Sequence, residues 1–225
     1  STSWAGNLRA HYANNIAQSC REAMADLGLS SGRVAFDDLR FGQQLGMETI
    51  EVVDGYDPMM YARCVKTDVE IELLKRATTV NEEAICRSIN AWSRGMMWQD
   101  FNHEYHKSVI ELGGFVRDPG AMVWGNPCGG DPAVTLHSRL DDFVMEPGMN
   151  ILFDCHGTLD LYCWDGGKTW VVDGEATGDA KQYATATADA ATAVMEAMRP
   201  GVTISDLQRV GRAVYRTNGV AGADD

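Results

Sequence analysis

The stretch from Asn150 to Val172 constrains the fold more than any other part of the chain. It contains two runs rich in β-branched and aromatic residues, on either side of Gly157-Thr158-Leu159-Asp160. Glycine and aspartate favour the tight turn of a β-hairpin, so the pattern predicts two antiparallel strands. With Leu159-Asp160 as the loop, Asp154 lies directly opposite Asp165, and the two carboxylates share one face of the hairpin.

Two carboxylates in this arrangement repel each other, which limits what the site can hold. At an effective dielectric constant of about 20, two unit charges about 4 Å apart interact by roughly 4 kcal/mol. The pair therefore shares a proton, pairs with a cationic side chain, or binds metal. The neighbouring positions on that face carry no Lys or Arg: they hold Leu152, His156, Cys163 and Gly167. We therefore favour metal; the alternative is a misplaced turn, with one Asp facing solvent.

The composition excludes several classes of partner. A chain of 225 residues with 45% hydrophobic content is long enough for one large domain, or for a domain and a fragment. Its 19 basic and 32 acidic residues give a net charge of -13, which argues against nucleic acid and against an anionic membrane. The sequence has no apolar run of the roughly 18 residues that a membrane span needs, and it does not open with a signal peptide. The six cysteines lack CxxC pairing, which predicts reduced thiols in a cytoplasmic protein.

The first 62 residues alternate between helical and extended patterns. The expected elements are a helix over Asn7–Gly28, a strand over Arg33–Phe36, a helical turn over Leu39–Gly46 and a strand over Thr49–Val53. A cluster of turn-forming residues follows from Val53 to Pro58. We place a domain boundary near Ala62.

Longer helices dominate from there. Thr67 and Glu70 form a capping box that opens a helix ending near Trp92. The other expected elements are a helix over Gln99–Leu112, strands over Phe115–Trp124 and Ala133–His137, a loop over Gly125–Pro132, a turn over Met145–Gly148, and helices over Asp179–Met198 and from Thr203 to Asn218. The run His103-Glu104-Tyr105-His106 lacks the histidine spacing of a zinc protease motif, so we interpret it as an exposed polar face.

Two stretches of the chain share a layout. A long helix is followed by Gly95 and Asp100-Phe101 in the first stretch, and by Gly201 and Asp206-Leu207 in the second, an offset of 106 residues. Under that offset, the strands that carry the two aspartates would recur beyond residue 225. The repeat therefore predicts a truncated product that lacks a second set of strands and half of the metal site.

These motifs resemble those of the creatinase and aminopeptidase (M24) family of metallopeptidases, which includes Xaa-Pro aminopeptidase, prolidase and methionine aminopeptidase. In that family a second Asp follows the first after eleven residues, as Asp165 follows Asp154. Tyr162 matches an aromatic residue that commonly precedes the second Asp. The segment Asp165-Gly166-Gly167-Lys168-Thr169 is similar to the family's Asp-x-Thr-Arg-Thr, and the resemblance extends from Arg63 to Gly219.

The resemblance implies an α+β fold. Residues 63–225 would form the first half of a pita-bread catalytic domain, and residues 1–62 the tail of an α/β creatinase-type N-terminal domain. Because methionine aminopeptidases generally lack that extra domain, the prolidase and aminopeptidase P branch is favoured.

The same resemblance implies roles for three residues. Asp154 would bind one metal ion, Asp165 would bridge two, and His137 would face the substrate. The ions would be divalent, with manganese first and cobalt, iron or zinc as alternatives, and the substrate would be a peptide or another small molecule. The remaining ligands, one His and two Glu, have no counterpart in this chain, so the fragment itself is expected to be inactive. The full-length protein would be a homodimer.

Some residues depart from the family pattern and leave alternatives open. Gly167 replaces a hydroxyl residue, and His156 replaces a glycine. With Leu159-Asp160 as the loop, Cys163 faces His156, and the two either pack together or act as softer ligands. The protein could therefore be a relative with a changed reaction, such as a dimethylsulfoniopropionate lyase or a creatinase-like enzyme. A non-catalytic pita-bread binding module is a third hypothesis, which retention of both aspartates disfavours.

Overall fold

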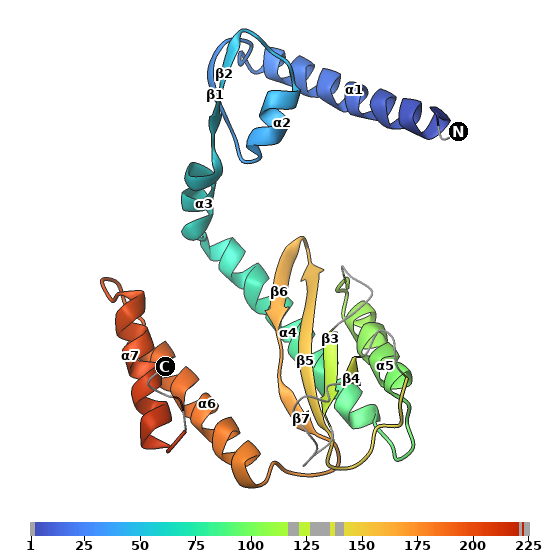
Figure 1. Cartoon of the computed structure of the whole chain (residues 1–225), viewed down its shortest axis with the longest axis vertical. Coiled ribbons are helices and arrows are strands. Elements are labelled where there is room, and N and C mark those ends of the chain that lie inside the picture. Colours follow the sequence, from blue (N-terminus) through green and yellow to red (C-terminus); the bar gives the residue numbers. More distant parts are fainter. Residues whose placement is uncertain (1–2, 117–121, 127–135, 138–141, 221, 223–225) are drawn as a thin grey trace. The chain divides into compact units, whose positions relative to one another are not determined.

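A computed structural model describes residues 3–116, 122–126, 136–137, 142–220 and 222 (Figure 1). The chain divides into two compact units, Ser1–Ile71 and Glu72–Asp225. The assignment of residues 1–62 to the tail of a creatinase-type N-terminal domain stays a prediction.

The first unit has the predicted α/β character. Helix α1 (Ser3–Asp26) precedes strand β1 (Gly32–Phe36), helix α2 (Leu39–Gln44) and strand β2 (Ile50–Asp54). The two strands pair in parallel. Helix α2 approaches them closely at Gly42, where a Cβ would lie 2.6 Å from Cδ2 of Phe36 and 2.8 Å from Cγ1 of Val52. A small core of Met24, Leu45 and Ile50 closes the unit.

The predicted turn cluster at Val53–Pro58 is only partly correct, because helix α3 (Tyr56–Cys64) begins inside it. The Asp54 carboxylate accepts a hydrogen bond from the Tyr56 N–H at 2.9 Å, which satisfies a free donor of the first turn. Pro58 also lies in that turn, where its missing N–H costs nothing. Residues typical of turns therefore start a helix here.

Two long helices of the second unit match the prediction. Helix α4 (Asp68–Ala91) opens with the expected capping box: Thr67 N donates to Glu70 Oε2 at 2.7 Å, and Glu70 N donates to Thr67 Oγ1 at 3.4 Å. Helix α5 (Trp98–Glu111) follows.

The strands of this unit form one antiparallel sheet, in the order β4-β3-β5-β6, with β7 also paired to β5. They are β3 (Met122–Asn126), β4 (Leu136–His137), β5 (Asn150–Leu159), β6 (Tyr162–Gly166) and β7 (Thr169–Val171). Gly125 and Asn126 belong to β3 rather than to the predicted loop, because they pair with Ile151 and Asn150. The rest of that loop, and residues 133–135 of the predicted strand, lie outside the described residues.

The core of this unit lies between one face of the sheet and helices α4 and α5. Alternate residues of β5 enter it, together with Trp98 and Phe101 of α5. Trp170 stacks on Phe101 with ring centroids 5.7 Å apart. Trp164 is buried in the same cluster. Both tryptophans thus cover the face opposite the aspartates.

Helices α6 (Gly178–Ala197) and α7 (Ile204–Thr217) form the second helix pair. Gln182 Nε2 donates to Asn218 O at 2.7 Å, and Thr203 and Asp206 cap α7 with a capping box. The equivalent glycines of the two pairs both have left-handed backbones, with φ of 89° at Gly95 and 92° at Gly201. The predicted layout of a long helix, a glycine and a shorter helix is thus present twice, while the repeat itself stays a prediction.

Two further findings concern the described residues as a whole. No helix among them is both long and apolar enough to cross a membrane. Their five cysteines are free thiols: Cys20, Cys64, Cys86, Cys155 and Cys163.

Candidate metal centre

The β5–β6 hairpin has one buried and one open face. Along β5, Phe153 and Cys155 are buried against the helices, whereas the alternating residues Asp154 and His156 are only half-buried. On β6, Asp165 is exposed. Because facing residues of paired strands project to the same side, Asp154 and Asp165 share the face turned away from α4 and α5.

The predicted register of this hairpin is wrong by two residues. The loop is Asp160-Leu161, not Leu159-Asp160, because Leu159 pairs with Tyr162. Asp165 therefore lies directly opposite His156, and Asp154 lies on the diagonal from Asp165. Diagonal neighbours have Cα atoms about 7 to 8 Å apart, where facing ones have Cβ atoms about 5 Å apart. The carboxylates remain on one face but stand further apart than the sequence predicted.

The turn itself shows why the sequence misled. Asp160 and Leu161 have φ of 50° and 69°, the left-handed pair that a two-residue type I′ loop requires. Aspartate tolerates this conformation, but leucine rarely does. Nothing in the sequence indicates that Leu161 would adopt a left-handed backbone conformation.

Close packing of Trp164 on Gly157 fixes the observed register. The two residues face each other, and a Cβ on Gly157 would lie 2.3 Å from Cζ2 of the indole ring. Under the predicted register Trp164 would instead lie opposite Cys155, whose side chain occupies that space. Only the glycine leaves room for the ring.

The register also changes the neighbours of Cys163. This residue pairs with Thr158 rather than facing His156 as predicted, although it stays exposed on the open face. His156 instead takes the position directly opposite Asp165. The imidazole thus belongs to the residue that directly faces Asp165 across the strands.

Gly167 has a steric role. A Cβ there would lie 1.4 Å from the carbonyl oxygen of Phe153, so no other residue fits without displacing the strand. The position carries glycine because the main chains of β5 and of the β6–β7 junction meet there, next to Asp154.

The third predicted site residue, His137, lies in the two-residue strand β4. Its backbone pairs with that of Trp124, and Trp124 in turn pairs with Leu152 of β5. Across the three strands, the backbone of His137 therefore lines up with that of Leu152, which lies two residues before Asp154 on β5.

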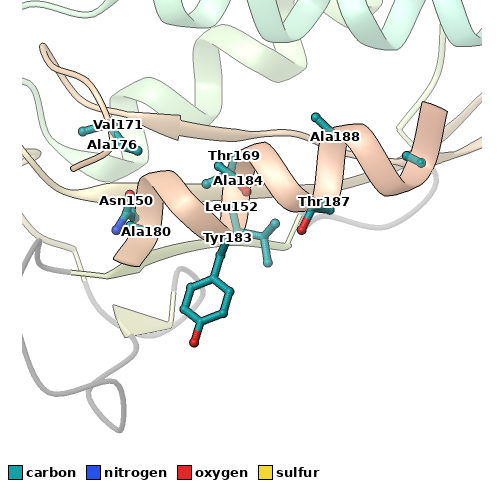
Figure 2. Close-up of a pocket in the computed structure, with 11 residues that line it drawn as sticks. Asn150, Leu152, Thr169, Val171, Ala176, Ala180, Tyr183, Ala184, Thr187 and Ala188 are labelled. Atoms are coloured by element: carbon teal, nitrogen blue, oxygen red, sulfur yellow. The ribbon is translucent and has the colours of Figure 1, made fainter. Parts of the chain in front are cut away.

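A pocket of about 850 Å³ adjoins the open face of the sheet without including either aspartate (Figure 2). One wall is formed by residues of β5 and β7, among them Leu152 and Thr169, and the other by alanines of α6 with Tyr183 and Thr187. Among the residues that the structure describes, its lining includes neither a charged side chain nor a histidine. The pocket therefore offers mainly apolar contacts.

The residues of the open face fit a metal only in part. Carboxylate oxygens suit hard divalent ions, and Asp154 and Asp165 provide them. Among the residues that the structure describes, however, no group of three or more His, Cys, Asp or Glu side chains is placed to hold one ion. Further ligands would have to come from elsewhere in the protein.

Comparison with known proteins decides the family. The sequence model described as Metallopeptidase family M24 matches residues 72–224, which is more than half of the chain. The chain belongs to metallopeptidase family M24. The match includes Asp154 and Asp165 together with the whole sheet.

Individual relatives of this M24 chain agree. The human protein named Xaa-Pro dipeptidase is 26% identical over 157 residues, which are 68% of this chain and 31% of that protein. The X-Pro aminopeptidase of Thermotoga maritima has a TM-score of 0.69 at 22% identity, over 91% of this chain and 58% of its own. The prolidase of Pyrococcus furiosus has a TM-score of 0.66 at 17% identity, over 85% of this chain and 57% of that prolidase.

These structural likenesses confirm the pita-bread fold that the resemblance implied. The M24 chain spans about a third of the length of the dipeptidase and less than two thirds of either structure.

A buried polar network behind the M24 hairpin was missed by the sequence reasoning. Asn81 of α4 donates from Nδ2 to the carbonyl oxygen of Gly166 at 3.0 Å, and its Oδ1 accepts from the Tyr105 hydroxyl of α5 at 2.9 Å. Asn81 and Tyr105 are 5% and 1% exposed. A signal existed, because Asn81 interrupts the apolar face of α4 between Ala77 and Ala84.

Burial governs the ionisable groups of this network. It raises the pKa of the Cys155 thiol to about 12, although a hydrogen bond with Tyr105 acts in the opposite direction. Burial likewise raises the pKa of Tyr105, and the neighbouring Cys155 adds to that shift. Both groups therefore stay protonated at neutral pH.

The histidine run of α5 is only partly the exposed polar face that the sequence predicted. His103 is exposed, but Tyr105 is in the core and His106 is half-buried. Burial, and then the charge of His103, lower the pKa of His106. The prediction failed at Tyr105 because its ring packs on the sheet while its hydroxyl bonds to Asn81.

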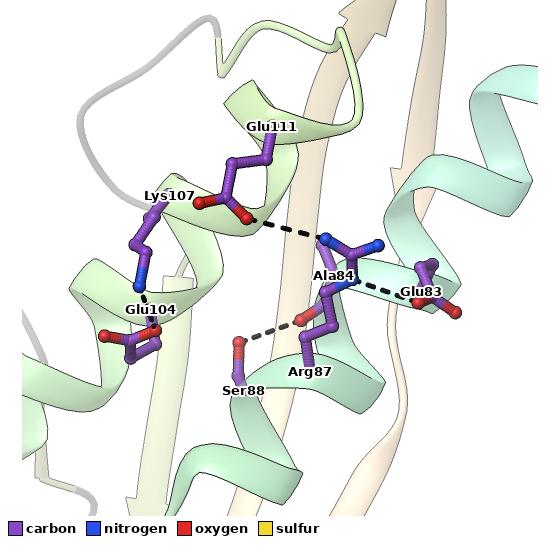
Figure 3. A network of polar contacts seen from close by, with 7 residues as sticks. All are labelled: Glu83, Ala84, Arg87, Ser88, Glu104, Lys107 and Glu111. Carbon is purple, nitrogen blue, oxygen red and sulfur yellow. Dashed lines mark hydrogen bonds and ion pairs between the residues drawn. The ribbon is translucent and has the colours of Figure 1, made fainter.

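Exposed ion pairs join the two helices of the M24 core on their outer side (Figure 3). Arg87 of α4 contacts Glu83 at 3.0 Å and Glu111 of α5 at 3.5 Å. Ser88 beside it donates to the carbonyl oxygen of Ala84 at 2.9 Å. These contacts lie away from the aspartates and serve packing rather than chemistry.

Proposed function

We propose that the full-length protein is a metal-dependent hydrolase of peptide or small amide bonds, of the Xaa-Pro aminopeptidase and prolidase type. One observation carries the proposal: Asp154 and Asp165 share the open face of the hairpin within the region that the M24 family matches. The names of the relatives support the Xaa-Pro type.

In this proposal two divalent ions are held, with Asp154 as a ligand of one and Asp165 as a ligand of both. Manganese is the first expectation, with cobalt, iron and zinc as alternatives. When bound, such ions lower the pKa of a coordinated water and polarise the amide carbonyl. The remaining ligands, one His and two Glu, would come from other parts of the protein.

His137 would act on the substrate rather than on the metal. A histidine there can donate a hydrogen bond to the charge that develops on the substrate oxygen, or a proton to the leaving nitrogen. Its backbone lines up across the sheet with Leu152, two residues from Asp154 on β5, and this position supports the role.

A second candidate function is a changed reaction on the same fold. His156 lies directly opposite Asp165 at a position where the family resemblance expects glycine. An added imidazole beside a metal-binding carboxylate would alter the preferred metal or the hydrogen bonding around it. Dimethylsulfoniopropionate cleavage and creatinase-like hydrolysis are the reactions to consider, and a non-catalytic binding module is the third hypothesis.

Assays of the full-length protein test these candidates. Purified protein loaded with manganese, cobalt, zinc or iron would be incubated with Xaa-Pro dipeptides, creatine and dimethylsulfoniopropionate. We expect turnover of Xaa-Pro dipeptides, and a loss of at least about 100-fold in Asp154→Asn and Asp165→Asn, since even partners of metal ligands are worth 10- to 100-fold. Asp160→Asn is the matched control, because its carboxylate lies at the turn and pairs with Arg76 at 3.2 Å.

The outcomes separate the hypotheses. Turnover of creatine or dimethylsulfoniopropionate alone would replace the peptidase proposal by a changed reaction. A full-length protein that binds no metal and turns over none of these substrates would favour the binding module. For the 225-residue chain itself we expect weak or absent manganese binding, and tight two-site binding in isothermal titration calorimetry would contradict that expectation.

A further inference from the structure

The segment that follows Asp165 has little support from the sheet. Strand β6 is at the edge of the described sheet, ends at Gly166, and resumes as β7 only at Thr169. Between them, Phe153 N donates to Lys168 O at 2.8 Å. Asp165 therefore stands one residue before the end of regular pairing, on a strand with a neighbour on one side only.

The space behind this segment is not filled by side chains. A pocket of about 180 Å³ lies between α4 and residues 164–168, with Asn81, Glu82 and Ile85 of the helix in its wall. Close packing normally fixes the position of a main chain. On the side of α4 this packing is incomplete, so polar contacts from the helix contribute to holding the segment.

The buried contact comes from Asn81. Its side chain is 5% exposed, and Nδ2 donates to the carbonyl oxygen of Gly166 at 3.0 Å. Loss of one partner of a largely buried hydrogen bond costs free energy, so the bond resists opening. It holds the Gly166–Gly167 peptide unit, one residue beyond Asp165.

Tyr105 fixes the orientation of that amide. Its hydroxyl donates to Asn81 Oδ1 at 2.9 Å, which leaves Nδ2 as the end that faces Gly166. A flipped amide would turn its oxygen towards the carbonyl oxygen, and the hydrogen bond would be lost. The two bonds run in one direction, from Tyr105 through Asn81 to Gly166, and each strengthens the other.

An ion pair between the same helix and the same segment offers an internal control. Glu82 of α4 contacts Lys168 at 2.9 Å, but the two side chains are 55% and 50% exposed. Solvent screens a pair of this kind, and its net contribution is small. Loss of the Glu82 contact and loss of the Asn81 contact should therefore have different effects.

We propose that Asn81 and Tyr105 are positioning residues of the metal centre, which hold the Asp165 carboxylate at the separation from Asp154 that two ions need. They act through the main chain of Gly166 and touch neither metal nor substrate. The inference rests on the function proposed above, in which both aspartates bind metal.

The test uses the full-length protein and four variants: Asn81→Ala, Tyr105→Phe, Glu82→Gln and Asp165→Asn. Manganese affinity is measured by calorimetry, and the pairing of the two ions by electron paramagnetic resonance. Hydrogen exchange over residues 162–170 is followed in the metal-free protein. Tyr105→Phe keeps the packed ring and removes only the hydroxyl, so it serves if Asn81→Ala fails to fold.

We expect Asn81→Ala to weaken manganese binding by about 10- to 100-fold, as loss of a group that orients a ligand does. Its spectrum should shift from a coupled pair towards isolated ions, as in Asp165→Asn, and exchange over residues 162–170 should accelerate. Tyr105→Phe should change in the same direction by a smaller factor. Glu82→Gln should match the wild type within about twofold.

Three results would overturn the inference. Manganese affinity within about twofold of wild type in both Asn81→Ala and Tyr105→Phe would refute it and leave the proposed function intact. An equal loss in Glu82→Gln would show general loosening of α4 rather than positioning. A wild-type protein that binds no pair of ions would refute the proposed function, and the exchange data would then still show whether Asn81 holds the segment.

Discussion

Replacing Gly167 by alanine should destabilise the sheet more than the same change at any neighbouring glycine. The new Cβ would lie 1.4 Å from the carbonyl oxygen of Phe153 and 2.5 Å from its carbonyl carbon, where ordinary contact begins at 3.4 Å. Both atoms belong to the main chain of β5. No side-chain rotation relieves the overlap, so the strands themselves must separate.

The structure gives the size of the effect. Ordinary contact requires the strands to move apart by about 2 Å, which breaks the 2.8 Å hydrogen bond from Phe153 N to Lys168 O. Overpacking costs about 1 to 3 kcal/mol or more, and each lost hydrogen bond adds about 1 kcal/mol. We therefore expect the free energy of unfolding to fall by about 2 to 4 kcal/mol. The midpoint of thermal unfolding would fall by about 4 to 16 °C for a chain of this size.

Two other glycines of the hairpin calibrate the measurement. A Cβ on Gly166 meets nothing within 4 Å, so Gly166→Ala should stay within about 0.5 kcal/mol of the wild type. A Cβ on Gly157 meets the Trp164 ring at 2.3 Å and the Phe115 carbonyl oxygen at 2.7 Å, so Gly157→Ala should fall between the two. Urea unfolding followed by circular dichroism and tryptophan fluorescence gives all three values. A Gly167→Ala variant as stable as Gly166→Ala would refute the steric reasoning.

Three smaller effects follow from other contacts. Arg87→Ala, which removes the exposed ion pairs of Figure 3, should lower the free energy of unfolding by at most about 1 kcal/mol, and less in 1 M salt; a larger loss measured in urea would contradict this. Thr203→Ala removes the cap of α7 and should cost about 1 kcal/mol with reduced helical circular dichroism, whereas unchanged ellipticity and stability would deny the cap any role. Burial raises the pKa of Cys155 from 9.0 to about 12, so its contribution to stability is complete below pH 9 and is lost as the pH rises through 12. Urea midpoints from pH 8 to 11 should fall more steeply in the wild type than in Cys155→Ala, and parallel slopes would be evidence against a buried thiol.

The sequence by itself determined most of the helices and the faces of the hairpin. Helix ends depend on local chemistry, so the capping box at Thr67 and the glycines after the helices predict them to within a few residues. The alternation of apolar and polar residues in β5 has a period of two. It therefore places Asp154 and Asp165 on one face without knowledge of any other part of the chain.

The same period explains what the sequence left open. A register shift of two residues keeps every side chain on its face, so alternation cannot distinguish the predicted pairing from the observed one. The contact of Trp164 with Gly157 decides between them, and it exists only once the strands meet. The turn at Leu161, whose residue type argues against a left-handed backbone, follows from that contact rather than directing it.

Only the tertiary structure revealed the support behind the candidate metal centre. Asn81, Tyr105 and Gly166 are widely separated along the chain, and no local pattern links a polar residue on one helix to a carbonyl on a strand. The family pattern supplies the two aspartates because their interval is a local property of the hairpin. Their separation depends on how helices α4 and α5 fix that hairpin from behind, which is decided by packing between distant parts of the sequence.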